Sequence, residues 1–418
     1  MRYRAPRITV SIALFASVAL LLLFFFFSTG VDPVHAAEGD LIGAQVVGTS
    51  GPLADAAPSV SMPAGALRTR DGRTLWSRDA QDERAMASTT KIMTALVVLD
   101  RADLDQPVTV SARAAGVGEA EVDLVAGQTL TVGELLEATL VRSANDAAYA
   151  LAEHVAGSVE EFVTLMNEKA ASLGLVHTSF ANPHGLDAPG HYTSAEDLAT
   201  LASIAMADPR FAAIVSQSSV TVLGANGLKR YDNSNKLLGS YEGADGVKTG
   251  WTNKAGYCVV ASATREPVGL IAVVLGTGDE NERFKEARAL LDWGFSHYAV
   301  TRVASAETSA ALIPVTDYLD RTVTAVVAED SVVPVFDLEG EISSSIDFVS
   351  DVDAPVVAGQ RLGTLTVVQG ERLLVQVPLV AQQAVERPET WSRVKIWLTR
   401  VWRSVFGGPL MASPAALM

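Results

Sequence analysis

Ser88-Thr89-Thr90-Lys91 leads directly into an apolar run, Ile-Met-Thr-Ala-Leu-Val-Val-Leu, that ends at Leu99. A run that is apolar on nearly all sides predicts a helix buried in a core. Ser88 and Lys91 are three residues apart, so a helix places their side chains on one face. An amine held beside a hydroxyl can take its proton and make the oxygen a nucleophile. Ser88 stands at the N-terminal end of the predicted helix, where free backbone N–H groups favour a developing oxyanion.

Two further short motifs follow, Ser143-Ala144-Asn145 and Lys248-Thr249-Gly250, and each pattern occurs once in the chain. Ser-x-x-Lys by itself carries little weight, because residues 392–395 fit it as well. All three motifs in this order rarely arise by chance. Together they indicate a serine nucleophile that acts on a peptide-like carbonyl.

Length and composition exclude several classes of protein. A chain of 418 residues suggests two or more domains, and 49% hydrophobic residues are ample for a core. The net charge of −16 argues against nucleic acid as a partner, because phosphate binding needs a basic surface. The single cysteine, Cys258, can form no internal disulfide, and its apolar surroundings predict a buried strand residue.

No metal or organic cofactor is expected. His177, His184 and His191 are evenly spaced, but the prolines and glycines between them break any helix that could align them. A serine acyl-enzyme needs neither a metal nor a cofactor.

The N-terminus reads as a targeting segment. Three arginines precede an apolar stretch at residues 8–27, and Val34-His35-Ala36 offers a small-residue cleavage site. Residues 1–36 are therefore predicted to be a signal peptide. The stretch is also long enough to span a bilayer, so an uncleaved anchor stays open as an alternative. Either way the remaining chain is expected outside the cytoplasmic membrane, with residues 37–60 as a linker.

Local signals predict an α+β fold. Asp71-Gly72 suits a two-residue turn between strands at 66–70 and 73–77. Helices are expected where capping patterns precede apolar periodicity, and strands where apolar runs are bounded by turns. The predicted helices begin at Thr131, Ser158, Ser194 and Asp279, with one more over 147–155 after the connection that carries Ser143 to Asn145; the predicted strands cover 219–223, 247–252, 257–264 and 268–276, with a hairpin at Asn226-Gly227.

The chain resembles a low-molecular-weight penicillin-binding protein of the D-alanyl-D-alanine carboxypeptidase type, peptidase family S11. Ser-x-x-Lys, Ser-x-Asn and Lys-Thr-Gly are the signature set of the wider superfamily. Longer shared stretches are Ala87-Ser-Thr-Thr-Lys-Ile-Met-Thr94, Ser143-Ala-Asn-Asp-Ala-Ala148, Asn182-Pro-His-Gly-Leu-Asp187 and Asp245-Gly-Val-Lys-Thr-Gly-Trp-Thr252. The resemblance implies a β-lactamase/transpeptidase-like catalytic domain at 61–300, an antiparallel sheet flanked by helices with an all-α part. A small β-rich domain is expected at 304–385.

The resemblance also implies roles for the motif residues. Ser88 would be the nucleophile, and Lys91 the expected general base, with a pKa lowered by burial and by the cation of Lys248. Ser143 would relay a proton to the leaving D-alanine. Asn145 would orient the substrate amide and Lys91.

The Lys-Thr-Gly strand would bind the substrate. Lys248 and Thr249 would hold its terminal carboxylate, and Gly250 would let the peptide backbone approach closely. The backbone N–H groups of Ser88 and Trp251 would form the oxyanion hole. The family often carries His or Tyr where Trp251 stands, a departure that alters the pocket wall but not a backbone donor.

Five accessory polar residues are expected to have structural tasks. Asn182, His184 and Asp187 match the family pattern and are expected to shape a loop. Asp146 and Asp245 are expected to be caps or turn residues.

The expected activity is a serine-type D-Ala-D-Ala carboxypeptidase that removes the terminal D-alanine from peptidoglycan stem pentapeptides and is inhibited by β-lactams. A DD-endopeptidase acting on cross-links, a β-lactamase and a catalytically silent binding protein remain alternatives. The β-lactamase is disfavoured because a class A enzyme needs a Glu-x-x-Leu-Asn pattern, which Glu161 and Asn167 do not fit. An intact motif set argues against the silent protein.

The C-terminal segment is strongly amphipathic. Over residues 388–407 an apolar side that contains three tryptophans faces away from Arg393, Arg400 and Arg403. This pattern is typical of a helix that lies in a membrane interface, and the family commonly ends in such an anchor. A helix packed on its own protein is the alternative. Residues 408–418 form a short tail, and the enzyme is expected at the outer face of the cytoplasmic membrane.

Overall fold

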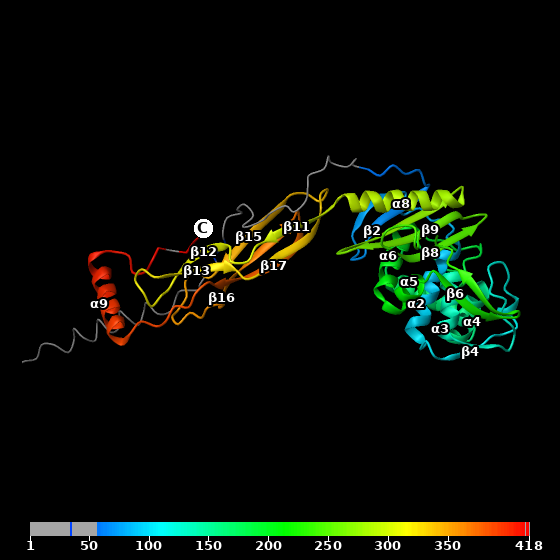
Figure 1. Ribbon diagram of the computed structural model, residues 1–418, viewed down its shortest axis with the longest axis horizontal. Helices are drawn as coiled ribbons and strands as arrows, with labels where there is room; N and C mark the ends of the chain where they lie inside the picture. Colours follow the sequence, from blue (N-terminus) through cyan, green and yellow to red (C-terminus); the bar gives the residue numbers. More distant parts are fainter. Residues whose placement is uncertain (1–33, 36–56, 414, 418) are drawn as a thin grey trace, which may run out of the picture. The chain divides into compact units, whose positions relative to one another are not determined.

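The computed structural model describes residues 34–35, 57–413 and 415–417. The predicted signal segment, apart from Val34 and His35, and the predicted linker as far as residue 56 lie outside the described residues. The chain divides into two compact units, which meet in sequence between Ala299 and Val300. The first, called the α+β unit here, contains all three motifs. The second, called the β unit, contains the C-terminal helix (Figure 1).

A five-stranded antiparallel sheet forms the centre of the α+β unit. Its strand order is β3-β2-β10-β9-β8, so β8 lies at an edge. The inner strands β9 and β10 are continuous apolar runs because both of their faces are covered. The strands are β2 Ala64–Thr69, β3 Thr74–Arg78, β8 Ala244–Thr252, β9 Gly256–Arg265 and β10 Val268–Thr277.

The first hairpin differs from its prediction in the turn. The strands pair as expected, but four residues, 70–73, connect them instead of two. Thr69 N donates to Arg73 O, while Arg70 N turns away and donates to Gly269 O of β10. Arg70 therefore bonds to β10 and not to its expected partner in the hairpin, Arg73.

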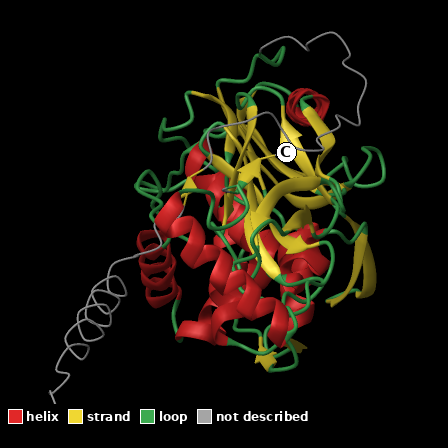
Figure 2. Ribbon diagram, turned by 90° about the vertical axis from the view of Figure 1, so that its left-hand side faces the viewer, coloured by secondary structure: helices red, strands yellow, loops and turns green. Residues whose placement is uncertain are grey.

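Helices cover both faces of the sheet. The amphipathic helix α8, Glu280–Ser296, packs on one face, against β9 and β10, and α6 packs on β10 and β2 (Figure 1). Figure 2 shows most helices of this unit gathered in one cluster beside the strands. The other long helices are α2 Lys91–Arg101, α4 Asn145–Ala156, α5 Val159–Ser172 and α6 Ala195–Ala207; shorter ones are α3 Val132–Glu137 and α7 Pro209–Val215.

The helix starts follow the capping signals. Thr131 and Glu134 form both hydrogen bonds of a capping box. At Ser158 one of the two bonds is present, in which the serine side chain accepts from the N–H of Glu161. The helix predicted to begin at Ser194 ends at Ala207, close to Pro209. Proline lacks an N–H and suits the first turn of a helix, so Pro209 opens α7, which bends 104° away from α6.

Short elements complete the α+β unit. The strands β6 Ser219–Gly224 and β7 Gly227–Asp232 form the expected hairpin, with Gly227 at a positive φ of 89°. A 3-10 turn, η1 Ala87–Thr90, precedes α2, and a π-turn, η3 Ala138–Arg142, follows α3. The remaining short elements are β4 Pro107–Thr109, η2 Ala114–Gly116 and β5 Thr129–Thr131.

The β unit has its own apolar core of valine, alanine and leucine side chains. A seven-stranded sheet has the order β1-β15-β16-β17-β13-β12-β18, and β11 pairs separately with β14. Its strands are β1 Val34–His35, β11 Tyr298–Ala304, β12 Ser309–Pro314, β13 Thr322–Val327, β14 Ser331–Phe336, β15 Ile342–Phe348, β16 Arg361–Gln369, β17 Arg372–Ala381 and β18 Ala416–Leu417.

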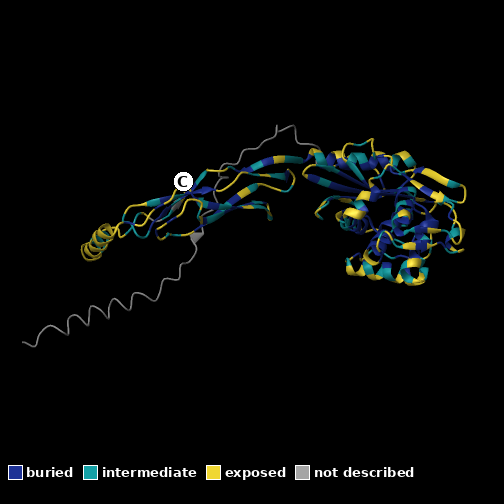
Figure 3. Cartoon of the chain, turned by 60° about the horizontal axis from the view of Figure 1, so that its bottom comes forward, coloured by how far each residue is buried: buried dark blue, intermediate teal, exposed yellow. Residues whose placement is uncertain are grey.

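The C-terminal helix α9, Thr390–Phe406, turns its polar side to its own unit. The Arg400 guanidinium donates to the carbonyl oxygens of Thr316 and Tyr318. The apolar side stays uncovered in the described part of the chain, and Figure 3 shows α9 mostly in the colour of exposed residues. The exposed fractions of its three tryptophans are 67% for Trp391, 62% for Trp397 and 63% for Trp402. No single helix among the described residues is long and apolar enough to cross a membrane.

Candidate active site

Ser88 and Lys91 meet at the junction of η1 and α2. Lys91 Nζ lies 3.1 Å from Ser88 Oγ, 2.7 Å from Asn145 Oδ1 and 2.6 Å from the backbone oxygen of His184. Lys91 is completely buried, yet among the described residues no carboxylate bonds to its amine. Burial lowers the pKa of Lys91 well below its ordinary value, and the cation of Lys248 lowers it further. A neutral amine beside the hydroxyl can therefore accept its proton.

The Ser-x-Asn motif is set by an irregular turn. The π-turn η3 ends at Ser143, which adopts a left-handed conformation with φ 69°. Asn145 is the first residue of α4 and not part of the predicted connection; the expected start at residue 147 was two residues late. Asn145 N donates to Ala120 O, and its Nδ2 donates to Gly118 O, so the Oδ1 remains for Lys91. Such π-turns and left-handed residues are frequent at functional sites.

Edge strand β8 carries the third motif past the nucleophile. Lys248 is buried, and its Nζ donates to Thr249 O. Burial lowers the pKa of Lys248 to about 7, with help from the cations of Arg283 and Arg142. The amine is therefore poised to gain a proton when an anion arrives.

Gly250 and Trp251 complete the strand beside Ser88. A Cβ on Gly250 would lie 2.9 Å from Ser88 N, so only glycine fits this approach of strand to nucleophile. Trp251 is 51% exposed, and its ring packs on Tyr257 with 5.9 Å between centroids. The side chain of Trp251 is thus free to line the rim of the site, while its backbone stays in the sheet opposite Tyr257.

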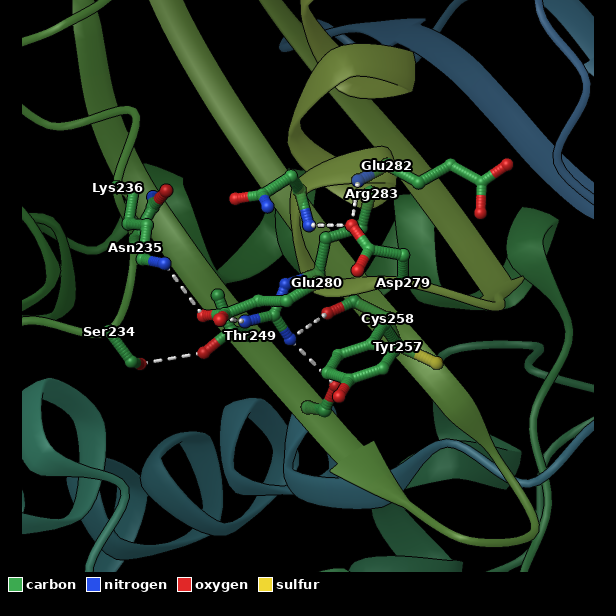
Figure 4. Close-up of polar contacts among 12 residues, drawn as sticks. Ser234, Asn235, Lys236, Thr249, Tyr257, Cys258, Asp279, Glu280, Glu282 and Arg283 are labelled. Atoms are coloured by element: carbon green, nitrogen blue, oxygen red, sulfur yellow. Dashed lines mark hydrogen bonds and ion pairs between the residues drawn. The ribbon is translucent and has the colours of Figure 1, made fainter.

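Two functional neighbours were missed by the motif search. Arg283 of α8 is buried, and its guanidinium donates to Gly250 O at 3.0 Å and lies over the Tyr257 ring (Figure 4). Ser234 Oγ lies 2.6 Å from Thr249 Oγ1. A signal for Arg283 existed in the sequence, because it occupies the helical side of α8 that also carries Ala287 and Leu290. A charged side chain on a buried helix face is rare unless it is paired with other polar groups.

Asn182, His184 and Asp187 shape loops, as expected, whereas the prediction that Asp245 is a cap or turn residue was wrong, because it lies in β8. Asn182 Oδ1 accepts from Gly185 N, and Asn182 Nδ2 donates to Leu186 O. Asp187 accepts a bond from Thr252 Oγ1. Asp146 accepts backbone N–H groups of Val122, Leu124 and Ala147, and Asp245 binds Arg70 and Thr264.

Cys258 lies in β9, as expected of a core residue. The thiol is completely buried, and burial raises its pKa to about 11. Within the described ranges, no group of three or more His, Cys, Asp or Glu side chains could hold a metal ion.

Comparison with known proteins agrees with this geometry. Residues 63–279 match the D-alanyl-D-alanine carboxypeptidase family of S11 peptidases, and residues 298–387 match the C-terminal domain of penicillin-binding protein 5. The chain is 33% identical to D-alanyl-D-alanine carboxypeptidase DacF of Bacillus subtilis over 76% of this chain and 83% of that one. It is 33% identical to DacC of Escherichia coli, with 84% of this chain and 91% of that one covered.

Solved structures confirm the predicted fold class. The D-alanyl-D-alanine carboxypeptidase DacD of Francisella tularensis superimposes with a TM-score of 0.60 at 25% identity, covering 82% of this chain and 98% of that one. The DD-transpeptidase of Streptomyces K15 gives a TM-score of 0.54 at 33% identity, covering 57% and 98%. The predicted family is likewise confirmed: this chain belongs to the D-alanyl-D-alanine carboxypeptidase family of serine peptidases.

Proposed function

We propose that the chain is a serine-type D-Ala-D-Ala carboxypeptidase that removes the terminal D-alanine from peptidoglycan stem pentapeptides through an acyl-enzyme on Ser88. One observation carries the proposal. A completely buried Lys91, with a strongly lowered pKa, lies 3.1 Å from Ser88 Oγ. A hydroxyl nucleophile needs such a base within hydrogen-bond reach.

Acylation uses the groups around this pair. Neutral Lys91 takes the proton of Ser88, and Ser88 Oγ attacks the carbonyl carbon between the two D-alanines. The backbone N–H groups of Ser88 and Trp251 stabilise the oxyanion. Ser143 relays the proton from Lys91 to the departing nitrogen, so that D-alanine leaves with a neutral amino group and not as an amide anion. A water molecule then hydrolyses the ester and returns Ser88.

The terminal carboxylate selects the substrate. Lys248 and Thr249 bind it, and the charged form of Lys248 is favoured as soon as the carboxylate approaches. Asn145 holds Lys91 through Oδ1 and orients the substrate amide. Gly250 lets the peptide lie along the open edge of β8. β-Lactams carry a carboxylate and a strained amide in a similar arrangement, so the same groups would take them as inhibitors.

The test is mass spectrometry of the purified full chain in detergent. The protein is incubated with penicillin and, separately, with diacetyl-Lys-D-Ala-D-Ala. We expect a lasting penicilloyl adduct on Ser88 and release of free D-alanine, with neither product from the S88A control. Rapid penicillin turnover without an adduct would instead indicate the β-lactamase. Cleavage of a cross-linked dimer in preference to the pentapeptide would indicate the endopeptidase.

We further propose that residues 1–36 direct export and that α9 holds the enzyme on the outer face of the cytoplasmic membrane, where it remodels the cell wall and so influences cell shape. The exposed tryptophans support this arrangement, because indole rings settle at the headgroup level of a bilayer. Arg400 can keep its hydrogen bond to Tyr318 of the β unit while the apolar side of α9 faces the membrane.

Cosedimentation with anionic vesicles tests the anchor. Residues 1–36 are removed from both proteins, so that the apolar N-terminal stretch cannot bind the vesicles. The chain that keeps α9 should sediment, whereas a form that also lacks residues 388–418 should stay in solution with its acylation by penicillin unchanged. R393Q, a change on the exposed polar side, is the matched control and should still sediment. If the truncated form bound vesicles as well as the chain that keeps α9, this helix would not be the anchor.

A further inference from the structure

Gly185 and Gly250 approach the peptide group between Ala87 and Ser88 closely. Ala87 adopts a positive φ of 48°, which is uncommon for a residue with a side chain. A Cβ on Gly185 would overlap the Ala87 carbonyl, and a Cβ on either Gly185 or Gly250 would lie 2.9 Å from Ser88 N. The two glycines thus lie close against this peptide group, Gly185 at its carbonyl and both at its N–H. Because a peptide group is planar and trans, its C=O and N–H point in opposite directions. Fixing the Ala87 carbonyl therefore also aims the Ser88 N–H.

A directed chain of hydrogen bonds ends on that carbonyl. Ala181 N donates to His191 Nδ1 at 2.9 Å, so Nδ1 is an acceptor and the ring proton belongs to Nε2. His191 Nε2 lies 2.8 Å from Thr90 Oγ1 and must be the donor there. The single hydroxyl hydrogen of Thr90 is then given to Ala87 O at 2.8 Å. Thr90 is fully buried and His191 only 4% exposed, so water does not compete for these bonds.

We propose that His191 is a positioning residue for the acylation step, which acts through Thr90 to orient the Ala87–Ser88 peptide group and thereby the Ser88 N–H of the oxyanion hole. The inference rests on the proposed function, in which that N–H receives the oxyanion. Each bond in such a chain polarises the next, and the donor is aligned before charge develops. The effect belongs to the transition state, so the rate of acylation should depend on it and substrate affinity should not.

The neutral form of His191 is required for the chain. Protonation would add an N–H at Nδ1 facing the N–H of Ala181, and two donors cannot bond to each other, so this hydrogen bond would be lost. Burial lowers the pKa of His191 to about 4, while Asp187 opposes and Lys254 supports the shift. The half-buried ring of His184 also interacts with His191, and desolvation lowers the pKa of His184 to about 3. The hydrogen-bond chain from His191 to Ala87 is therefore intact at neutral pH and breaks only in acid.

Two matched pairs of variants test the inference. T90V removes the hydroxyl and keeps the shape, while T90S keeps the hydroxyl. H191F removes both ring bonds, while H191Q can accept from Ala181 and donate to Thr90. The rate constant for penicillin acylation is measured for each, together with kcat and KM for diacetyl-Lys-D-Ala-D-Ala.

T90V and H191F should lower the acylation rate and kcat on the order of 10- to 100-fold, less than complete loss of an oxyanion donor, with KM changed by less than about twofold. T90S and H191Q should stay within about threefold of the wild type. In the wild type the acid limb of the acylation rate should contain a step near pH 4 that H191Q lacks.

Several results would overturn the inference. The inference fails if penicillin acylates T90V as fast as T90S. It also fails if penicillin acylates H191Q as slowly as H191F. The comparison of T90V with T90S does not involve H191F, so it stays decisive even if H191F fails to fold. If the wild type is acylated by penicillin but releases no D-alanine, the carboxypeptidase proposal fails while the acylation comparison still stands. A wild type that does neither would overturn both.

Discussion

Replacing His191 with glutamine should make the protein less sensitive to acid. His191 is buried as a neutral ring whose Nδ1 accepts a backbone N–H, and its pKa of about 4 lies well below the ordinary value of 6.5. When the chain unfolds, the ring meets water and regains its ordinary pKa. Glutamine offers the same acceptor and donor but binds no proton in this range, so it removes the linkage between folding and pH.

The size of the effect follows from the two pKa values. Between pH 6.5 and pH 4 the unfolded chain binds a proton that the folded chain does not, so the free energy of unfolding falls as the pH decreases. From pH 8 to pH 5 the loss from His191 alone is about 2 kcal/mol. The pKa of His184 is lowered to about 3 and adds a loss of the same sign, but both proteins contain His184 and it cancels in the comparison.

Urea unfolding at pH 8 and pH 5, followed by ellipticity at 222 nm, measures the difference. Helices α2 to α8 lie in the α+β unit, so this signal reports mainly on the unit that contains His191. H191Q should lose about 2 kcal/mol less than the wild type between the two pH values. H154Q, at an exposed position of α4, is the control and should behave as the wild type does. If H191Q and the wild type lost the same free energy within about 0.5 kcal/mol, near the error of extrapolation, the reasoning would be refuted.

Three further changes test the electrostatics and packing of the site. K248Q removes a cation that lowers the pKa of Lys91, so the acid limb of penicillin acylation should move to higher pH. G250A puts a Cβ 2.9 Å from Ser88 N and should slow acylation on the order of 100-fold, with an unchanged circular dichroism spectrum. R283Q removes the main cation that lowers the pKa of Lys248, so the rise of KM above about pH 7 should begin at a higher pH, as a KM–pH profile from pH 6 to 9 would show.

The sequence predicted the features that local chemistry controls. The motif residues sit beside strong secondary-structure signals, and the Thr131 cap and the β6–β7 hairpin formed as their patterns indicate. The family motifs supplied the rest of the expected fold. Small errors occurred where neighbours in space compete with local preference: Arg70 bonds to β10 instead of closing a tight turn.

The residues that the sequence did not reveal work through distant contacts. His191 was considered as a metal ligand and as part of a stretch shared with the family, Gly190-His-Tyr192, but no role was predicted for it, because its partner Thr90 is 101 residues away along the chain. Arg283 acts on Gly250 across 33 residues and two strands. No periodicity or spacing encodes such pairs. They become visible only once packing brings the Arg283 side chain of α8 to Gly250 of β8 and the loop before α6 to η1.

The two glycines around the Ala87–Ser88 peptide group restrict how antibiotic resistance could evolve in this enzyme. Any side chain at Gly185 or Gly250 would displace the same N–H that stem peptide and β-lactam both need. Under the proposed function, a mutation there that excludes the drug would also end the housekeeping reaction. Selection for reduced drug binding must therefore act on residues further from the nucleophile, and the half-exposed ring of Trp251 is the first such position beyond the Lys-Thr-Gly motif.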